Sequence, residues 1–263
     1  MSTPLIIFED SDMLVLSKPS GMTVNRADTT TGETTLQDFV EEYLHLPKGE
    51  PRVSDTYNAE EVFRSRAGIV HRLDKETSGV ILIAKTVDSF QKLQAQFKER
   101  TVKKVYTALA HGKVEPQEGE INAPIGRLPW NRMRFGVIAD GREAVTKFKV
   151  QSLKFKVGNE PLTLLELFPE TGRTHQIRVH LKHINHPIFG DFLYAGRKTA
   201  RDDRKILERV FLHASKISFS HPVSGEALTF DCPLTEELQG VLKHLSADMK
   251  DLQNEPEADT INR

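Results

Sequence analysis

The apolar and polar positions of the chain follow two kinds of pattern, which together predict short strands and amphipathic helices. Short β-branched or alternating runs bounded by turn residues predict strands at 5–8, 13–17, 80–84, 102–110, 143–150, 162–168, 211–219 and 227–231. Apolar residues three or four positions apart predict helices at 36–44, 88–99, 173–184 and 233–245. Thr34 or Thr35 can cap the first of these helices, and Asp88 can cap the second. Because short turns join so many neighbouring strands, we expect one α+β domain with a mostly antiparallel sheet.

Three segments show neither the spacing of apolar residues typical of strands nor the spacing typical of helices. Residues 47–66 contain prolines and a glycine among polar groups and predict a loop that stays mobile until a partner orders it. Residues 122–136 predict a turn-rich loop, and beyond Ser246 the polar, acidic sequence predicts a frayed tail. The expected organisation is a folded domain over residues 1–245 followed by a tail over residues 246–263.

Composition narrows the class of protein. The 263 residues carry a formal net charge of -1, so any surface for nucleic acid must come from local clustering of basic residues. The single cysteine, Cys232, excludes an internal disulfide and suits a reducing compartment. The N-terminal residues have no basic segment before an apolar one, and no apolar run reaches the length of a membrane span. We therefore expect a cytoplasmic protein that is not associated with a membrane.

The stretch at 68–85 is the most informative part of the sequence. A charged run at 71–78 separates two apolar runs, and the second of these predicts a buried strand. Asp74 therefore lies in a turn that leads into a core strand, and loops held by a rigid scaffold are where chemistry is usually placed. The alternative is a surface turn in which Asp74 forms a solvated ion pair with a basic neighbour.

In two other stretches, aromatic side chains lie beside small residues or beside basic residues. Tyr106 shares one face of its predicted strand with two alanines, which leaves room for a flat ring; a tyrosine half-buried in the core is the alternative. Between 122 and 136, basic and aromatic side chains alternate as they do in readers of single-stranded RNA, although such a loop can also be merely solvated. These side chains are Arg127, Trp130, Arg132, Arg134 and Phe135.

Four histidines follow the predicted strand that ends at residue 168. Offsets of five, three and three residues between His175, His180, His183 and His186 do not match the two-histidine helix face of zinc hydrolases. We therefore expect no metal at these histidines. The start of the predicted helix offers unpaired backbone N–H groups to an anion, and Arg173 lies in its first turn.

Residues 71–79, His-Arg-Leu-Asp-Lys-Glu-Thr-Ser-Gly, match the His-Arg-Leu-Asp-x-x-Thr-Ser-Gly signature of the RluA family of pseudouridine synthases. Four further blocks resemble that family in order and at its usual spacing, at 8–21, 104–112, 171–191 and 212–226. Five ordered blocks within residues 5–245 are not expected by chance. The resemblance implies the fold of that family, which is an extended, mixed and mostly antiparallel sheet flanked by helices with a central active-site cleft. Many relatives carry an S4-like RNA-binding domain before the first strand, and we expect it to be absent here.

The resemblance also implies a reaction, the isomerisation of uridine to pseudouridine in RNA. The C1′–N1 bond breaks, the base turns while it stays bound, and it is rejoined through C5. A carboxylate can attack the sugar or the base ring covalently and then leave. Because the leaving uracil delocalises its negative charge over two carbonyls, one carboxylate can suffice where glycosidases use two. The resemblance assigns this nucleophilic role to Asp74.

Other residues receive roles from the same resemblance. Arg173 would pair with Asp74 and keep it ionised; Arg178 is the second choice for this pairing, and phosphate binding is the alternative for Arg173. Tyr106 would stack on the uracil and can assist removal of the C5 proton. Arg72 would fill the gap left by the flipped uridine or hold a phosphate, unless it only pairs with a nearby acid. Further substrate contacts are expected from His71, Leu73, Thr77, Arg132, Arg134 and Arg178.

The implied reaction needs no metal and no organic cofactor, because it is an isomerisation without net redox change. The expected partner is a stem-loop of ribosomal or transfer RNA, contacted by residues 47–66, 126–135 and 197–205, and we expect a monomer without an obligate protein partner. Two other classes of function stay open. An inactive RNA-binding module of the same fold should have lost Asp74, Tyr106 or Arg173, and a nucleoside hydrolase should show paired acids or a metal cluster.

Overall fold

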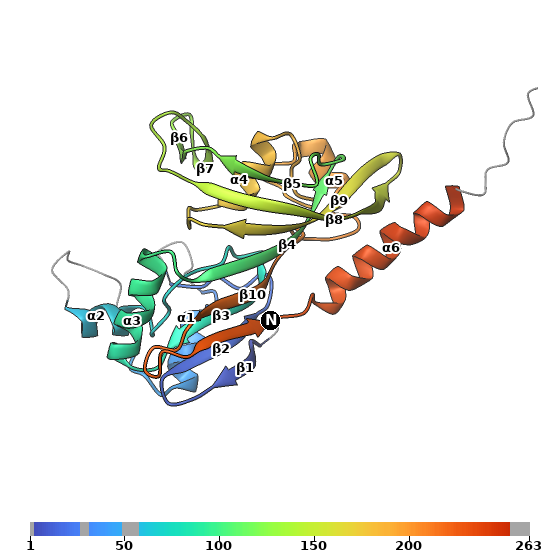
Figure 1. The fold of residues 1–263 in the computed structure, drawn as a ribbon. Coiled ribbons are helices and arrows are strands. Elements are labelled where there is room, and N and C mark those ends of the chain that lie inside the picture. The colour runs from blue at the N-terminus through green and yellow to red at the C-terminus, as the bar shows by residue number, and fades with distance from the viewer. Residues whose placement is uncertain (1–2, 27–31, 49–57, 253–263) are drawn as a thin grey trace, which may run out of the picture.

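The structure is a computed structural model that describes residues 3–26, 32–48 and 58–252, apart from the side chains of Arg132, Met133 and residues 247–252. Within these residues, nine strands form one sheet in the order β1-β2-β3-β10-β4-β9-β8-β5, with β11 paired to β10 (Figure 1). The strands are β1 (Leu5–Glu9), β2 (Met13–Lys18), β3 (Ser78–Ala84), β4 (Lys103–His111), β5 (Glu118–Asn122), β8 (Val145–Val157), β9 (Glu160–Pro169), β10 (Leu212–Ser220) and β11 (Ala227–Asp231).

The neighbours in this sheet pair antiparallel, except that β3 pairs parallel with β10 through Ser78–His213 and Gly79–Ala214. The predicted mixed, mostly antiparallel α+β sheet is therefore confirmed. The strands predicted at 5–8 and 13–17 pair as the hairpin β1–β2, and those predicted at 211–219 and 227–231 pair as the hairpin β10–β11.

Two hydrophobic cores lie along this continuous sheet. The first packs β2 and β3 against α1 (Leu36–Tyr43), α2 (Ala59–Ser65) and α3 (Val87–Lys98). The second packs β4, β8 and β9 against α4 (Gln176–His183) and the first part of α6 (Glu236–Leu252). Tyr106 of β4 packs against both cores, so it lies at the junction between them.

Two segments predicted to be loops contain regular structure. Within 47–66, α2 forms because Asn58 and Glu61 cap each other's backbone N–H groups and Phe63 packs edge-on against Phe90 at 5.8 Å; residues 49–57 lie outside the described residues. Within 122–136, β6 (Ile125–Leu128) and β7 (Asn131–Val137) pair as a hairpin. The arginines interleaved with apolar residues in this hairpin made its strand-like alternation hard to recognise in the sequence.

Several helix limits also differ from the prediction. α4 begins at Gln176 rather than at Arg173, because His175 has a left-handed backbone with φ 55 that no helical turn can contain. The cap of α3 is Thr86, whose side chain accepts the Ser89 N–H, and not Asp88; the Thr35 cap of α1 is confirmed. The short α5 (Arg197–Asp203) was not predicted.

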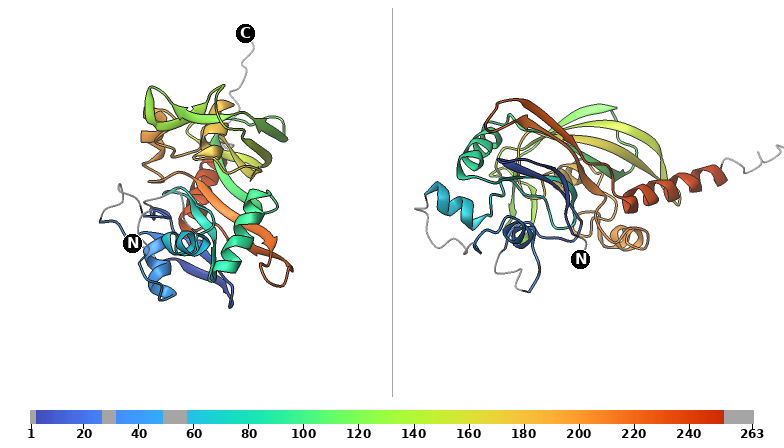
Figure 2. Two further views of the ribbon diagram at one scale, coloured as in Figure 1. Left: turned by 90° about the vertical axis from the view of Figure 1, so that its left-hand side faces the viewer. Right: turned by 90° about the horizontal axis from the view of Figure 1, so that it is seen from below.

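α6 is longer than predicted and leaves the body of the molecule. It continues to Leu252, beyond the predicted end at Leu245, and it projects away from the sheet in every view that shows its length (Figures 1 and 2). Leu238, Val241 and Leu245 attach its first turns to the second core. None of the helices in the described part of the chain is both long enough and apolar enough to cross a membrane.

Candidate active site

The loop that carries Asp74 is pinned at the point where it enters β3. The Thr77 N–H donates to the Asp74 carbonyl at 3.1 Å and closes the turn. Gly79 follows with φ +115, and a Cβ there would lie 2.2 Å from the Ala214 carbonyl oxygen on β10. Only glycine permits this approach, which brings the catalytic loop against the centre of the sheet.

The first core supports the same loop through residues 18–21. The Lys18 side chain is fully buried, and its Nζ donates to the carbonyls of Pro19 and Met22 at 2.8 Å and of Lys75 at 3.2 Å. The Gly21 N–H also donates to the Lys75 carbonyl at 2.9 Å. The sequence pattern indicated only the end of a strand here, although a lysine that closes an apolar strand was a usable signal for such a support.

The second half of the chain holds the loop through Glu76. Arg204 Nη2 donates to both Glu76 carboxylate oxygens, at 2.9 and 2.6 Å, and the Val210 N–H donates to Oε2 at 3.0 Å. Arg209 Nη1 donates to the Glu76 carbonyl at 3.3 Å. The catalytic loop is thus fixed from both cores, and the contacts of Arg204 and Arg209 were not predicted from sequence.

Arg178, and not Arg173, forms the ion pair with Asp74. Arg178 Nη1 lies 3.2 Å from Asp74 Oδ2, while its Nε and Nη2 hold the fully buried Asp191 at 2.7 and 2.9 Å. Burial opposes the charge, but the hydrogen bonds and charges of Asp191 and Asp74 together raise the pKa of Arg178. Asp74 keeps 20% of its side chain exposed and lines the cavity beside the Arg178 guanidinium.

Arg173 lies in the loop before α4, where its Nε donates to the Glu143 carbonyl at 2.9 Å. Its backbone N–H donates to Gln176 Oε1 at 3.0 Å, so the N–H expected to be free for an anion is used within the loop. Burial and the nearby charges of Arg142 and Arg100 lower the pKa of Arg173. The predicted pairing with Asp74 is therefore wrong, and Arg173 belongs to a group of cations at the mouth of the cavity.

The cavity has a volume of about 550 Å³, within the usual range of small-ligand sites of about 300–1,000 Å³. Its lining includes Asp74, Tyr106 and Thr77. Burial, and then the negative charge of Asp74, raise the pKa of Tyr106, so its hydroxyl is neutral at physiological pH. Among the described residues, the buried Thr77 Oγ1 forms no hydrogen bond.

The remaining residues of the 71–73 signature have separate surroundings. His71 Nε2 accepts the Leu82 N–H at 2.9 Å, and its ring stacks on Phe97 at 4.8 Å. Burial, and then the charge of Lys104, lower the pKa of His71 to about 3, so it is a neutral support for the pocket wall. Leu73 is part of the first core and also lines the cavity, while Arg72 is exposed at its rim.

The arginine-bearing hairpin β6–β7 is attached to this site through Tyr194. The Tyr194 hydroxyl accepts the Phe135 N–H at 3.1 Å and lies 2.9 Å from His175 Nδ1. Its ring lies under the guanidinium of Arg178 at 5.1 Å. Arg134 is half-buried on β7, and the side chain of Arg132 lies outside the described part. Tyr194 was missed because nothing in its local sequence sets it apart.

The histidines of the third block lie in different surroundings. His180 is buried in the protein, with Nδ1 at 2.9 Å from Thr146 Oγ1 and Nε2 donating to the Ala123 carbonyl at 3.0 Å. His186 Nδ1 donates to the His111 carbonyl at 2.8 Å. His175 bonds to Tyr194 instead, so these three rings serve as structural links between elements.

Solved structures with this fold carry the same class of domain. Human RNA Pseudouridylate Synthase Domain Containing 1 superposes with a TM-score of 0.66 at 25% sequence identity and covers 98% of this chain and 97% of its own. Human RNA Pseudouridylate Synthase Domain Containing 4 gives a TM-score of 0.65 at 26% identity, with 91% and 92% covered. The fold and its cleft therefore define a pseudouridine synthase domain.

Sequence comparison agrees with the structures. The family model for RNA pseudouridylate synthase matches residues 12–183, and the chain belongs to this family. Ribosomal large subunit pseudouridine synthase D of Neisseria meningitidis is 39% identical over 247 residues, which is 91% of this chain and 60% of that protein. The protein of the same name in Nitrosomonas europaea is 38% identical over 243 residues, which is 90% of this chain and 64% of that protein. The chain thus spans less than two thirds of the length of these two relatives.

Proposed function

We propose that the protein isomerises uridine to pseudouridine in structured RNA, either ribosomal or transfer RNA. The observation that carries this proposal is Asp74, held by Arg178 at 3.2 Å and open to a cavity that Tyr106 also lines. Two relatives named as ribosomal large subunit pseudouridine synthases support a ribosomal target. The inactive RNA-binding module weighed at the start should lack part of this constellation, and all of it is present.

Each residue of the site has a separate role in the proposed reaction. Asp74 attacks the sugar or the base ring, and Arg178 keeps it ionised and oriented. Tyr106 offers the flipped uracil a ring face, and its neutral hydroxyl can assist the later loss of the C5 proton. Arg72, at the rim, fills the gap left in the RNA or holds a phosphate.

The rim of the cavity supports RNA as the partner. Arg100, Arg142 and Arg173 lie together there, and the charges of the other two lower the pKa of Arg173. Such a concentration of positive charge is relieved by the phosphates of a nucleic acid. We further propose that residues 1–245 act as one catalytic unit, since both cores contribute to the site, and that the protein acts as a monomer on cytoplasmic RNA.

The decisive experiment incubates the protein with ribosomal and transfer RNAs transcribed in vitro with tritium at C5 of uridine. The wild-type protein should release tritium, and Asp74→Asn should reduce release to background. Asp88→Asn is the matched control, because Asp88 is an exposed carboxylate at the far end of α3. Release that survives in Asp74→Asn would refute the assignment of the nucleophile, and no release by the wild type from any of these RNAs would refute the function.

A further inference from the structure

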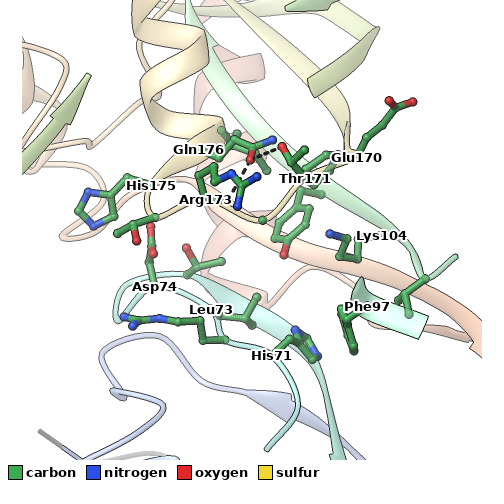
Figure 3. A pocket seen from close by; sticks show the side chains of 18 of the residues that line it. His71, Leu73, Asp74, Phe97, Lys104, Glu170, Thr171, Arg173, His175 and Gln176 are labelled. Atoms are coloured by element: carbon green, nitrogen blue, oxygen red, sulfur yellow. Dashed lines mark hydrogen bonds between the residues drawn. The ribbon is translucent and has the colours of Figure 1, made fainter. Parts of the chain in front are cut away.

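Lys104 lies in the catalytic cavity, and neither the signature nor the mechanism above uses it. It precedes Tyr106 by two positions on β4, so both side chains emerge on the same face of the strand, roughly 7 Å apart. Both line the cavity. Lys104 lies with His71 and Phe97 at the end of the cavity opposite Asp74 and His175 (Figure 3).

The other cations of the cavity are either committed or exposed. Arg178 holds Asp74 and Asp191, Arg100 pairs with Glu143, and Arg173 donates to a carbonyl. The remaining ones, Arg72, Lys98 and Arg142, are exposed at the rim. The Lys104 side chain is half-buried, and its ammonium has no hydrogen bond or ion pair with any described residue. A half-buried ammonium without a partner is costly, which indicates that a ligand completes its surroundings.

His71 does not supply that partner. Its Nε2 accepts the Leu82 N–H, so its remaining ring nitrogen carries a hydrogen and cannot accept one from Lys104. The stack of His71 on Phe97 instead forms the wall at this end of the cavity. Because Lys104 is half-buried, solvent screens its charge less than it screens the charges of the exposed cations at the rim.

Resting on the proposed function, we infer that Lys104 is a further catalytic residue, whose ammonium binds a carbonyl oxygen of the uracil and stabilises the negative charge of the detached base. A uridine whose sugar lies at Asp74 and whose base covers Tyr106 extends toward Lys104. When the C1′–N1 bond breaks, its electron pair goes to the uracil and spreads onto the carbonyl oxygens. The lysine keeps its proton in this step, in which Asp74 has taken the place of N1 on C1′. The base then bonds to C1′ through C5 while the bond from C1′ to Asp74 breaks and returns the carboxylate; C5 afterwards loses its proton and N1 takes one up from solvent.

A phosphate is the less suitable ligand for this ammonium. Phosphates of a bound RNA follow the surface, and the exposed Arg72, Lys98 and Arg142 already lie at the rim to meet them. Lys104 lies instead on the strand that carries the base-stacking tyrosine. Electrostatic stabilisation at the atom where charge develops is worth about 10²–10³ in rate when one donor is removed.

Burial, and then the charge of Lys103, lower the pKa of Lys104 to about 8. The protonated form is therefore lost as pH rises through about 8, and the chemical step should slow on this alkaline side. The charged and titratable groups around it come from β4, the catalytic loop, the end of α3 and the loop before α4: Lys103, Tyr106, His71, Asp74, Lys98, Arg100, Glu170 and Arg173.

The test compares Lys104→Met, Lys104→Arg and the matched control Lys103→Met under single turnover, on an RNA from which the wild type releases tritium. Lys103 is exposed and adjacent in sequence, and its side chain emerges on the other face of β4. We expect Lys104→Met to slow tritium release by about 10²-fold or more while its RNA dissociation constant stays within about threefold. Lys104→Arg should recover most of the rate and keep it at pH 9, where the wild type has slowed; Lys103→Met should keep the wild-type rate at pH 7.

Three results would overturn the inference. They are an unchanged rate in Lys104→Met, a loss of RNA affinity without a loss of rate at saturation, and an alkaline decline in Lys104→Arg identical to that of the wild type. Thermal melting shows whether each variant is folded, and Lys104→Arg keeps the test valid if the methionine variant is not. The wild-type protein is assayed beside the variants. If only this inference is wrong, the wild type still releases tritium. If the proposed function is wrong, none of the proteins releases tritium, and this inference fails as well.

Discussion

At the scale of single residues, one backbone conformation decides which arginine meets Asp74. The left-handed His175 ends the loop and starts α4 at Gln176, which turns Arg178 toward the carboxylates and leaves Arg173 at the mouth. A helical period in the sequence is compatible with either start. The family resemblance named both candidates and ranked Arg173 first; the sequence could not correct that order, because left-handed backbone at a histidine has no reliable signature.

The two arginines should give opposite kinetic defects. Arg178→Lys should lower the single-turnover rate by about 10²-fold with little change in RNA affinity, because lysine cannot form the fork that joins Asp74 to Asp191. Arg173→Ala should weaken RNA binding several-fold and leave the rate at saturating RNA within about threefold. Tritium release and filter binding measure the two quantities, and a catalytic defect confined to Arg173→Ala would restore the original assignment.

His71 makes the stability of the protein depend on pH. Its pKa is lowered to about 3 in the folded state, whereas in the unfolded chain it is about 6.5. The unfolded state therefore binds the extra proton between these values, so the contribution of His71 to stability is complete above about pH 6.5 and is lost as pH falls toward 3.

His71→Gln should remove this part of the pH dependence, because glutamine can still accept the Leu82 N–H but does not titrate. Urea unfolding at pH 7.5 and pH 5 should show a smaller loss of stability in the variant than in the wild type. His183→Gln, an exposed histidine on α4, serves as the control and should behave as the wild type does. Equal losses in all three proteins would mean that His71 does not carry the effect.

At the scale of elements, the hairpin β6–β7 depends on Tyr194 for its position. Tyr194→Phe keeps the ring under Arg178 but leaves the Phe135 N–H and His175 Nδ1 without their partner. Each lost partner of a buried polar group costs about 1–3 kcal/mol. We expect faster amide exchange over 125–137 and an RNA dissociation constant raised about tenfold, with the rate at saturation largely kept. Tyr43→Phe removes an exposed hydroxyl bond to Glu9 and should change neither.

The elements that the sequence predicted well are those whose regularly spaced apolar residues pack into one core. β2 and β3 begin with or consist of apolar runs of the right length, and α1 carries both its period and its cap at Thr35. α2 and the hairpin β6–β7 were missed because their stability comes from contacts that are distant in sequence, such as Phe63 on Phe90 and Phe135 on Tyr194. Local pattern carries no record of such contacts.

At the scale of the whole molecule, the net charge of -1 gives no sign of the cluster of arginines at the rim of the cavity. Arg142 is exposed there with Arg100 and Arg173. Arg142→Ala should weaken binding of RNA and reduce the slope of log affinity against log salt by about 1, as expected for one lost phosphate contact. Lys113→Ala, an exposed lysine outside the cavity, is the control. An unchanged slope in Arg142→Ala would place the RNA elsewhere.

The antiparallel sheet and the family signature could be predicted from the sequence, yet the assembly of the site could not. Lys18 fixes the loop from the first core, and the pair of Glu76 with Arg204 fixes it from the second half of the chain. Such contacts depend on how the strand order β3-β10-β4 brings distant segments together. No spacing along the chain encodes that order.

The distance along the chain between Asp74 and Arg178 has a consequence for the newly made protein. The carboxylate emerges from the ribosome first, and its counter-charge follows 104 positions later, after most of the second core has been synthesised. A truncated copy that stops before α4 displays the acid without the cation that orients it. The ion pair that faces the cavity can therefore form only after synthesis has passed α4.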